Sequence, residues 1–84
     1  MNDNSKVVVK WLDAKIYPGM HKASEALERK MDTFESLGYL IERNDQATII
    51  AHEITGEGEY RDVLLIPSGS VISIYELVGQ GDAK

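Results

Sequence analysis

The fold is decided by residues 60–75, YRDVLLIPSGSVISIY, in which two β-favouring runs flank a short break. The runs YRDVLLI (60–66) and VISIY (71–75) are rich in the β-branched and aromatic residues that strands prefer. At the break, Pro67 fixes φ and Gly69 permits turn conformations that other residues resist. Because consecutive strands joined by short turns pair antiparallel, the stretch predicts the last two strands of an antiparallel sheet.

Three earlier strands are predicted upstream of this stretch. The first contains three consecutive valines and Trp11, and the turn Tyr17-Pro18-Gly19 ends it. The next two are joined by Asn44-Asp45, which is typical of a hairpin, and a Gly-rich turn then leads into the decisive stretch. The expected strands are residues 6–16, 34–43, 48–51, 60–66 and 71–75.

A helix is predicted between the first two strands, because the apolar period changes there from two to nearly four. Good helix formers fill residues 21–32. Ser24 is a candidate N-cap, and a start nearer Met20 is the alternative. The apolar stripe of this helix consists of Ala23, Ala26, Leu27 and Met31, and Phe34 continues it.

The fold class that follows is α+β, mostly β: a small five-stranded antiparallel barrel, SH3-like or Sm-like, with one helix between strands 1 and 2. A short and strongly twisted sheet removes its free edges by curling, which favours the barrel. An open antiparallel sheet with the helix packed on one face is the alternative. Trp11 is expected in the core, against the helix stripe or against Ile72 and Ile74.

Length and composition indicate one domain, residues 1–84, with an ordered core at about residues 6–78 between a loose end at residues 1–5 and a frayed tail at residues 79–84. A core this small favours association with a further copy or with a partner. The sequence has no cysteine, so it has no disulfide framework and no thiolate metal site. No apolar run approaches the length of a membrane span, and residues 1–5 lack signal-peptide character. A soluble, cytoplasmic protein without membrane contact is therefore expected.

No catalytic, cofactor-binding or metal site is expected, and the chain is predicted not to be an enzyme. His21 and His52 are the only histidines, and strand alternation directs His52 and Glu53 to opposite faces. Four acidic residues crowd one hairpin without the spacing of a calcium loop. This pattern indicates a solvated turn or an acidic face for a basic partner. The four residues are Glu53, Glu57, Glu59 and Asp62.

Short motifs carry a resemblance to known proteins. They are Trp11-Leu12-Asp13-Ala14, and Ser36-Leu37-Gly38-Tyr39-Leu40 followed by Ile66-Pro67 and Val71-Ile72-Ser73-Ile74. With them, the chain resembles a widespread group of small uncharacterised proteins of bacteriophages and prophages. The last two strands are also similar to the second half of an Sm motif, whose final strand pairs with the next subunit and whose loops bind RNA. The turn here, residues 67–70, lacks the basic or Arg-Gly character of RNA-binding members.

The expected function is that of a non-catalytic protein-interaction or self-assembling module encoded by a phage or prophage. Its partner is expected to be a further copy of the chain or a host or phage protein. An exposed strand of the sheet is expected to extend a neighbouring sheet. The candidate interface residues are Val71, Ser73, Tyr75 and Tyr60.

Two other functions are weighed against this one. The first is nucleic-acid binding by an Sm-like barrel that uses Lys6, Lys10 and Lys15. The net charge of −5 disfavours it, since nine basic residues stand against fourteen acidic ones. The second is an acidic decoy or small-ligand sponge that acts against a host defence.

Overall fold

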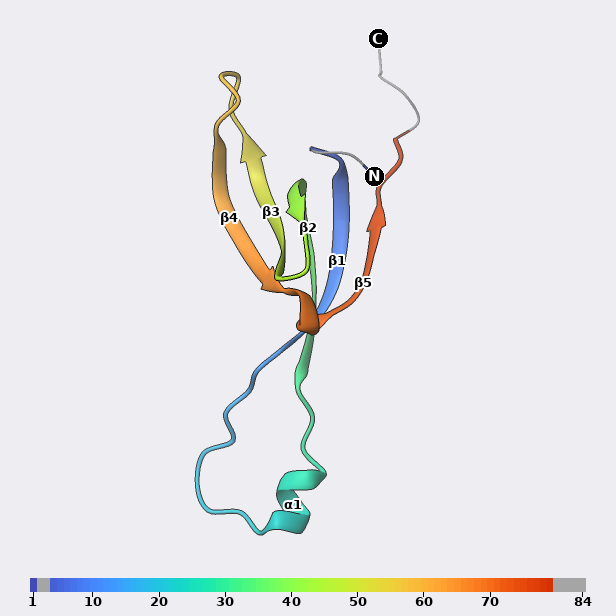
Figure 1. Cartoon of the computed structure of the whole chain (residues 1–84). Coiled ribbons are helices and arrows are strands. Elements are labelled where there is room, and N and C mark those ends of the chain that lie inside the picture. Colours follow the sequence, from blue (N-terminus) through green and yellow to red (C-terminus); the bar gives the residue numbers. More distant parts are fainter. Residues whose placement is uncertain (2–3, 80–84) are drawn as a thin grey trace.

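The chain folds into one open sheet of five antiparallel strands with a single short helix in the part described (Figure 1). The structure is a computed structural model and describes residue 1 and residues 4–79. The mostly β composition and the five antiparallel strands predicted from the sequence are confirmed. In chain order the elements are β1 (Lys6–Asp13), α1 (Ala23–Leu27), β2 (Asp32–Arg43), β3 (Ala47–Ile54), β4 (Tyr60–Pro67), the 3-10 turn η1 (Ser68–Ser70) and β5 (Val71–Glu76).

The strands are arranged in the order β4-β3-β2-β1-β5, so β4 and β5 lie at opposite ends of the sheet. The expectation that these two consecutive strands pair with each other is therefore wrong. Their connection, Ser68–Ser70, forms a 3-10 turn rather than a two-residue hairpin loop. It directs the chain to the free edge of β1, where β5 pairs antiparallel with a register shift between Lys10 and Trp11.

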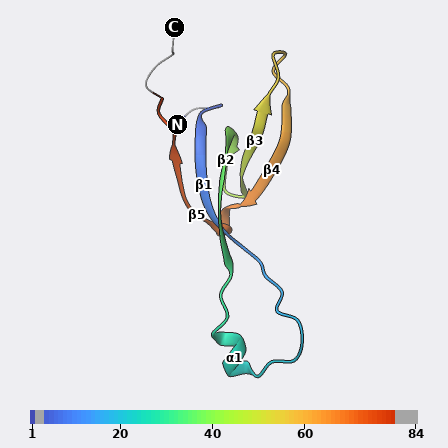
Figure 2. The ribbon, with the colours of Figure 1, turned by 180° about the vertical axis from the view of Figure 1, so that it is seen from behind.

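The short η1 connection requires a strongly curved sheet. Four strand spacings of about 4.8 Å would place the end strands of a flat sheet roughly 19 Å apart. A three-residue 3-10 turn rises only about 2 Å per residue and spans much less. The end of β4 and the start of β5 consequently converge at η1, while the two strands diverge away from it (Figures 1 and 2).

The core lies on the concave side of this curved sheet. Alternation along β1 directs Val7 and Val9 to one face, and both are fully buried there. They pack with Leu40 of β2, Ile50 of β3 and Ile66 of β4. The half-buried apolar residues Trp11, Leu64, Val71 and Ile74 pack against this cluster.

Gly38 allows β2 and β3 to approach closely beneath the core. It lies opposite Val7 in the β1–β2 ladder. A Cβ at this position would come within 2.7 Å of the Ala51 carbonyl oxygen and 3.1 Å of the Ile50 Cβ. Both of these atoms belong to backbone or to the root of a buried side chain, so neither can move aside cheaply.

Trp11 packs against the sheet core, as expected, but with neighbours other than the helix. Its ring lies 5.3 Å from the ring of Phe34, its cross-strand partner on β2. Its indole N–H donates a hydrogen bond of 3.0 Å to the Ser36 hydroxyl. Because Trp11 is half-buried and its polar atom is satisfied, it fits the rim of the core.

The helix lies between β1 and β2 in the chain, as predicted, but the prediction is wrong about its length and about its packing on the sheet. Instead of residues 21–32, α1 spans only Ala23–Leu27, all of its residues are exposed, and it lies away from the sheet (Figure 2). Phe34, expected to continue the stripe, belongs to β2, which begins at Asp32. Pairing of β2 with β1 over this segment outweighs the helix propensity of its residues, which is only a weak preference.

The ends of the first strand also differ from expectation. β1 stops at Asp13 rather than at residue 16. Two residues predicted to be a loose end are bound to β2, because the Asn4 N–H donates to the Leu40 carbonyl and the Leu40 N–H donates to the Ser5 carbonyl. The predicted frayed tail at residues 79–84 lies outside the described residues, apart from Gly79.

Gly38→Ala is expected to destabilise the fold by about 1 to 3 kcal/mol, the usual cost of overpacking a well-filled core. The measurement is urea unfolding followed by far-UV circular dichroism. Gly56→Ala is the matched control, because a Cβ at Gly56 meets no atom within 4 Å. Equal stabilities for the two variants would contradict the close approach at Gly38.

Trp11→Ala is expected to cost about 3 kcal/mol, at the lower end for aromatic truncation because the ring is only half-buried. Trp11→Phe keeps the ring contact with Phe34 and loses only the indole hydrogen bond, for which about 1 kcal/mol is expected. Thermal and urea unfolding measure both variants. An unchanged melting temperature together with lost self-association would instead assign Trp11 to an interface.

Candidate functional site

The most distinctive surface of the molecule is the segment that joins β1 to β2. Residues 14–31, called the arm below, project beyond the end of the sheet and carry α1 (Figures 1 and 2). Every residue of the arm is exposed except Tyr17, which is half-buried. The arm therefore adds little to the core, and its conformation is set by contacts within itself.

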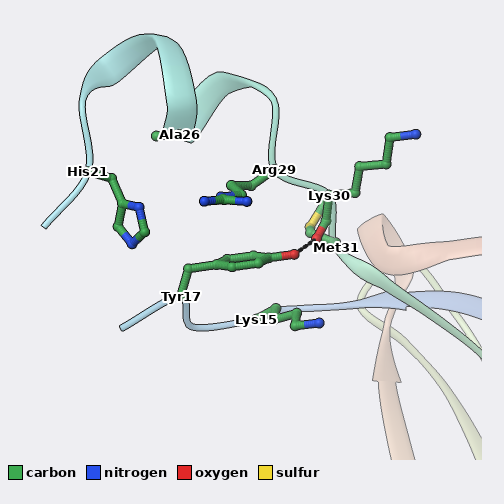
Figure 3. A pocket seen from close by; sticks show the side chains of 7 residues that line it. All are labelled: Lys15, Tyr17, His21, Ala26, Arg29, Lys30 and Met31. Atoms are coloured by element: carbon green, nitrogen blue, oxygen red, sulfur yellow. Dashed lines mark hydrogen bonds between the residues drawn. The ribbon is translucent and has the colours of Figure 1, made fainter. Parts of the chain in front are cut away.

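Tyr17 organises the arm. Its hydroxyl donates a hydrogen bond of 2.7 Å to the Lys30 carbonyl, which joins the two sides of the arm. The Lys15 ammonium and the Arg29 guanidinium each lie 5.2 Å from the ring centroid, on opposite sides of the ring (Figure 3). Each exposed cation–π contact of this kind is worth about 0.5 to 1 kcal/mol. Both faces of the Tyr17 ring are thus covered by cations of the arm itself.

Two carboxylates lie close together at the base of the arm, and Lys15 offsets their repulsion. Asp13 at the end of β1 lies directly opposite Asp32 at the start of β2, and like charges in this position repel. The Lys15 ammonium binds the Asp32 carboxylate at 3.2 Å. The hydrogen bond and the charge of Asp32 raise the pKa of Lys15 above its ordinary value. The carboxylate of Asp13 accepts the Ala14 N–H at 2.9 Å.

Between Tyr17 and α1 the arm encloses a hollow of about 320 Å³ (Figure 3). His21 lines this hollow, and its Nε2 atom lies 3.0 Å from the Pro18 carbonyl oxygen. The hollow offers positive charge and hydrocarbon surface but no free aromatic face for stacking. Its lining residues are Lys15, Tyr17, His21, Ala26, Arg29, Lys30 and Met31.

Charge is divided unevenly between the arm and the rest of the chain. The arm holds four basic and two acidic residues, a net charge of +2. The remaining chain holds five basic and twelve acidic residues, a net charge of −7. Lys15 is paired with Asp32, whereas Lys22 and Lys30 make no ion pair with any described residue.

The arm also exposes large apolar side chains. Met20 is 100% exposed, Ile16 88% and Leu27 86%, and Met31 is more than half exposed. Several large apolar groups left exposed on one projecting segment are more typical of a binding element than of ordinary solvent contact. The sequence pattern suggested a core-facing stripe, and the structure leaves Leu27 and Met31 uncovered.

The acidic hairpin predicted from the sequence lies at the opposite end of the molecule from the arm (Figure 1). The Thr55 hydroxyl oxygen accepts the N–H groups of Glu57 and Glu59 and so fixes the turn between β3 and β4. Glu53 binds Arg61 across the strands at 3.3 Å. Within residues 1 and 4–79, no three or more His, Asp or Glu side chains are grouped as metal ligands.

The outward face of the sheet carries a second exposed apolar surface. Cross-strand partners share a face, and the pairs on this side include Val8 with Tyr75, Ala51 with Val63, and Ile49 with Leu65. Val8 and Ala51 are buried by their neighbours, whereas Tyr75, Val63 and Leu65 remain exposed. Apolar surface on this side thus reaches both end strands, β4 and β5.

The four interface residues predicted from the sequence do not share one surface. Tyr75 is exposed on the outward face, whereas Val71 packs against the core. Ser73 is half-buried opposite Lys10 on β1. Tyr60 lies on β4, at the other end of the sheet order, and its hydroxyl donates to the Asn4 side-chain oxygen at 2.8 Å.

The three predicted nucleic-acid contacts are spread along β1 and into the arm. Lys6 and Lys10 share the outward face of β1 by alternation. Lys10 lies opposite Glu35 on β2, and Lys15 is bound to Asp32, so acidic groups accompany two of the three lysines. The two histidines lie on different elements, His21 on the arm and His52 on β3.

Sequence reasoning missed the arm as a site. Its residues were assigned to the end of a strand, a turn and a helix with one apolar stripe, and no site was predicted at Lys22, Arg29 or Lys30. The signal that was available is compositional, because four of the nine basic residues of an acidic chain fall within residues 14–31.

Comparison with protein-family models, with curated proteins and with solved structures gave no match. The functional assignment therefore rests on the residues and geometry of this chain. Within the described residues no helix is both long and apolar enough to cross a membrane.

Tyr17→Ala is expected to loosen the arm while leaving the sheet intact, because Tyr17 alone joins the two sides of the arm and does not pack against the core. Trypsin should cleave after Lys22, Arg29 or Lys30 at least about tenfold faster, because the loss of the Tyr17 contacts lowers the free-energy cost of opening the arm. The free energy of unfolding of the whole domain should change by no more than about 0.5 kcal/mol, as is usual for surface substitutions.

Tyr17→Phe is the matched control, since it keeps both cation–π contacts and removes only the hydroxyl. Its cleavage rate should fall between those of the parent and Tyr17→Ala. A large loss of global stability in either variant would show that the arm is coupled to the sheet core.

Proposed function

We propose that the chain is a non-catalytic protein-interaction or self-assembling module that uses the arm as a docking element. The observation that carries the proposal is the exposure of Ile16, Met20, Leu27 and Met31 on a projecting arm. The concave core of the sheet is complete without them. A segment that is held in shape yet buries so little apolar surface gains from a partner that covers it.

The finer fold proposed for the module is a small SH3-like or Sm-like barrel that is incompletely closed. The strand order β4-β3-β2-β1-β5 and the η1 turn between the two end strands support this assignment. The convergence of β4 and β5 at η1 supports it further. A relation to small phage and prophage proteins is supported only by short motifs, which are Trp11-Leu12-Asp13-Ala14, Ser36-Leu37-Gly38-Tyr39-Leu40, Ile66-Pro67 and Val71-Ile72-Ser73-Ile74.

The end strands supply a second surface for assembly. β4 and β5 each have one edge without a partner strand in the described sheet, and such edges pair readily with other strands. Tyr75 is exposed on β5, and Val63 and Leu65 are exposed on β4. These exposed apolar groups at the two edges of the sheet support contact with a protein rather than with a polar polyanion.

Nucleic-acid binding is the competing proposal, and the positive charge of the arm favours it. Two features of the arm oppose it. Both faces of Tyr17 are already occupied by Lys15 and Arg29, so bases have no aromatic face on which to stack. Met20 and Leu27 would gain little from a phosphate backbone, whose attraction is electrostatic.

Size-exclusion chromatography with light scattering, performed over a wide concentration range, tests the proposal for self-assembly. Affinity capture with the parent and with Met20→Ser/Leu27→Ser tests it for other partners. The expected result is association that is lost in the double variant without a change in melting temperature. The proposal would be wrong if the parent chain stays monomeric at every concentration and captures the same proteins as the double variant.

Fluorescence anisotropy with single-stranded RNA and DNA tests the competing function. At about 50 mM salt the electrostatic attraction extends well beyond contact distance, so this is the most sensitive condition. No binding is expected there. Binding that is abolished by Arg29→Glu would favour the nucleic-acid function instead.

A further inference from the structure

The two surfaces with opposite character lie at the two ends of an elongated molecule. The chain measures 59 × 25 × 23 Å along its principal axes. The arm lies at one end of the sheet and the turn between β3 and β4 at the other (Figures 1 and 2). With this separation, the arm does not reach the hairpin of its own chain, and any contact between them joins two copies.

The charges of these two ends are complementary. The arm carries +2 in total, and its Lys22 and Lys30 ammonium groups have no described ion-pair partner. Residues 52–62 of the β3–β4 hairpin contain four acidic residues and one arginine, a net charge of −3 with neutral histidine. Only Glu53 among these acids is bound to the arginine. Glu57 and Glu59 project from the exposed turn.

The apolar groups of the two ends are complementary as well. The arm exposes Met20 and Leu27, and the half of β4 next to the acidic turn exposes Tyr60 and Val63. Contact between the two surfaces would bury apolar area and pair charges at its rim, which is the usual composition of a protein interface. A polyanion would satisfy only the charges, so a second copy of the chain is the occupant that fits both features.

From these features we infer that the chain assembles head to tail, with the arm of one copy docked on the β3–β4 hairpin of the next. This inference deepens the proposed function and rests on it. The contact is heterologous, because different surfaces of the two copies meet. When every copy docks on the next in this way, the copies close into a ring if the rotation between neighbours divides a full turn, and otherwise they form an open filament.

Charge reversal on each surface tests the inference. The arm variant is Lys22→Glu/Lys30→Glu, and the hairpin variant is Glu57→Lys/Glu59→Lys. None of these four side chains makes a described hydrogen bond or ion pair, so both variants should fold like the parent. In sedimentation velocity each variant alone should associate at least about tenfold more weakly than the parent, because like charges then face each other.

Mixing the two variants in equal amounts is the decisive step. Each variant now carries two ends of one sign, and the arm of either is complementary to the hairpin of the other. Association should therefore return on mixing. Lys6→Glu/Arg43→Glu is the matched control, since it changes the net charge as the arm variant does but lies on neither surface. It should associate like the parent.

The outcomes separate this inference from the broader proposal. Association of the parent that is unaffected by both charge reversals keeps self-assembly and overturns the head-to-tail contact. Loss of association in both variants without recovery on mixing also overturns the contact. A monomeric parent overturns it too, and the capture experiment with Met20→Ser/Leu27→Ser then decides the interaction function separately. Arm-dependent binding of a single-stranded oligonucleotide by such a monomer would assign the arm to nucleic acid.

Discussion

The structure depends on β1, because this strand pairs with β2 on one edge and with β5 on the other. Its valines are buried on both faces: Val7 and Val9 in the concave core and Val8 beneath the outward residues. Without β1 the last strand would have no partner, since η1 carries β5 away from β4. β1 thus supplies three of the seven buried apolar residues in the described part of the chain, and the arm that leaves its end supplies none of them.

The separation of core and arm has a physical cause at the junction between them. The β1–β2 ladder ends where Asp13 and Asp32 face each other, and continued pairing would bring further exposed segments together without apolar gain. Lys15 offsets this repulsion by binding Asp32, and Tyr17 then joins the two sides of the arm farther out. Local polar contacts, which are individually weak, are sufficient to shape a segment that no core contact restrains.

The positions of the strands were predictable from the sequence because β-branched runs and turn residues are local signals. The pairing of β5 with β1 was not, since it depends on how the 3-10 turn at Ser68–Ser70 redirects the chain. The arm was missed for a related reason. The apolar spacing of Leu27 and Met31 places both on one side of the predicted helix, but periodicity does not say what covers that side. The acidic hairpin was located correctly, whereas its relation to the arm required the three-dimensional arrangement.

Folding leaves most of the apolar surface of the arm in contact with solvent. Full burial of a residue such as Leu27 or Met20 is worth about 1.5 to 3 kcal/mol, and the folded chain obtains almost none of it. In a domain whose total stability is only about 5 to 15 kcal/mol, this is a substantial unrealised contribution. A contact between copies would realise it only when the arm meets apolar surface. Charge opposite in sign to that of the arm favours the hairpin end, where Tyr60 and Val63 are exposed near the acidic turn. The proposed contact would therefore use residues other than those that stabilise the sheet.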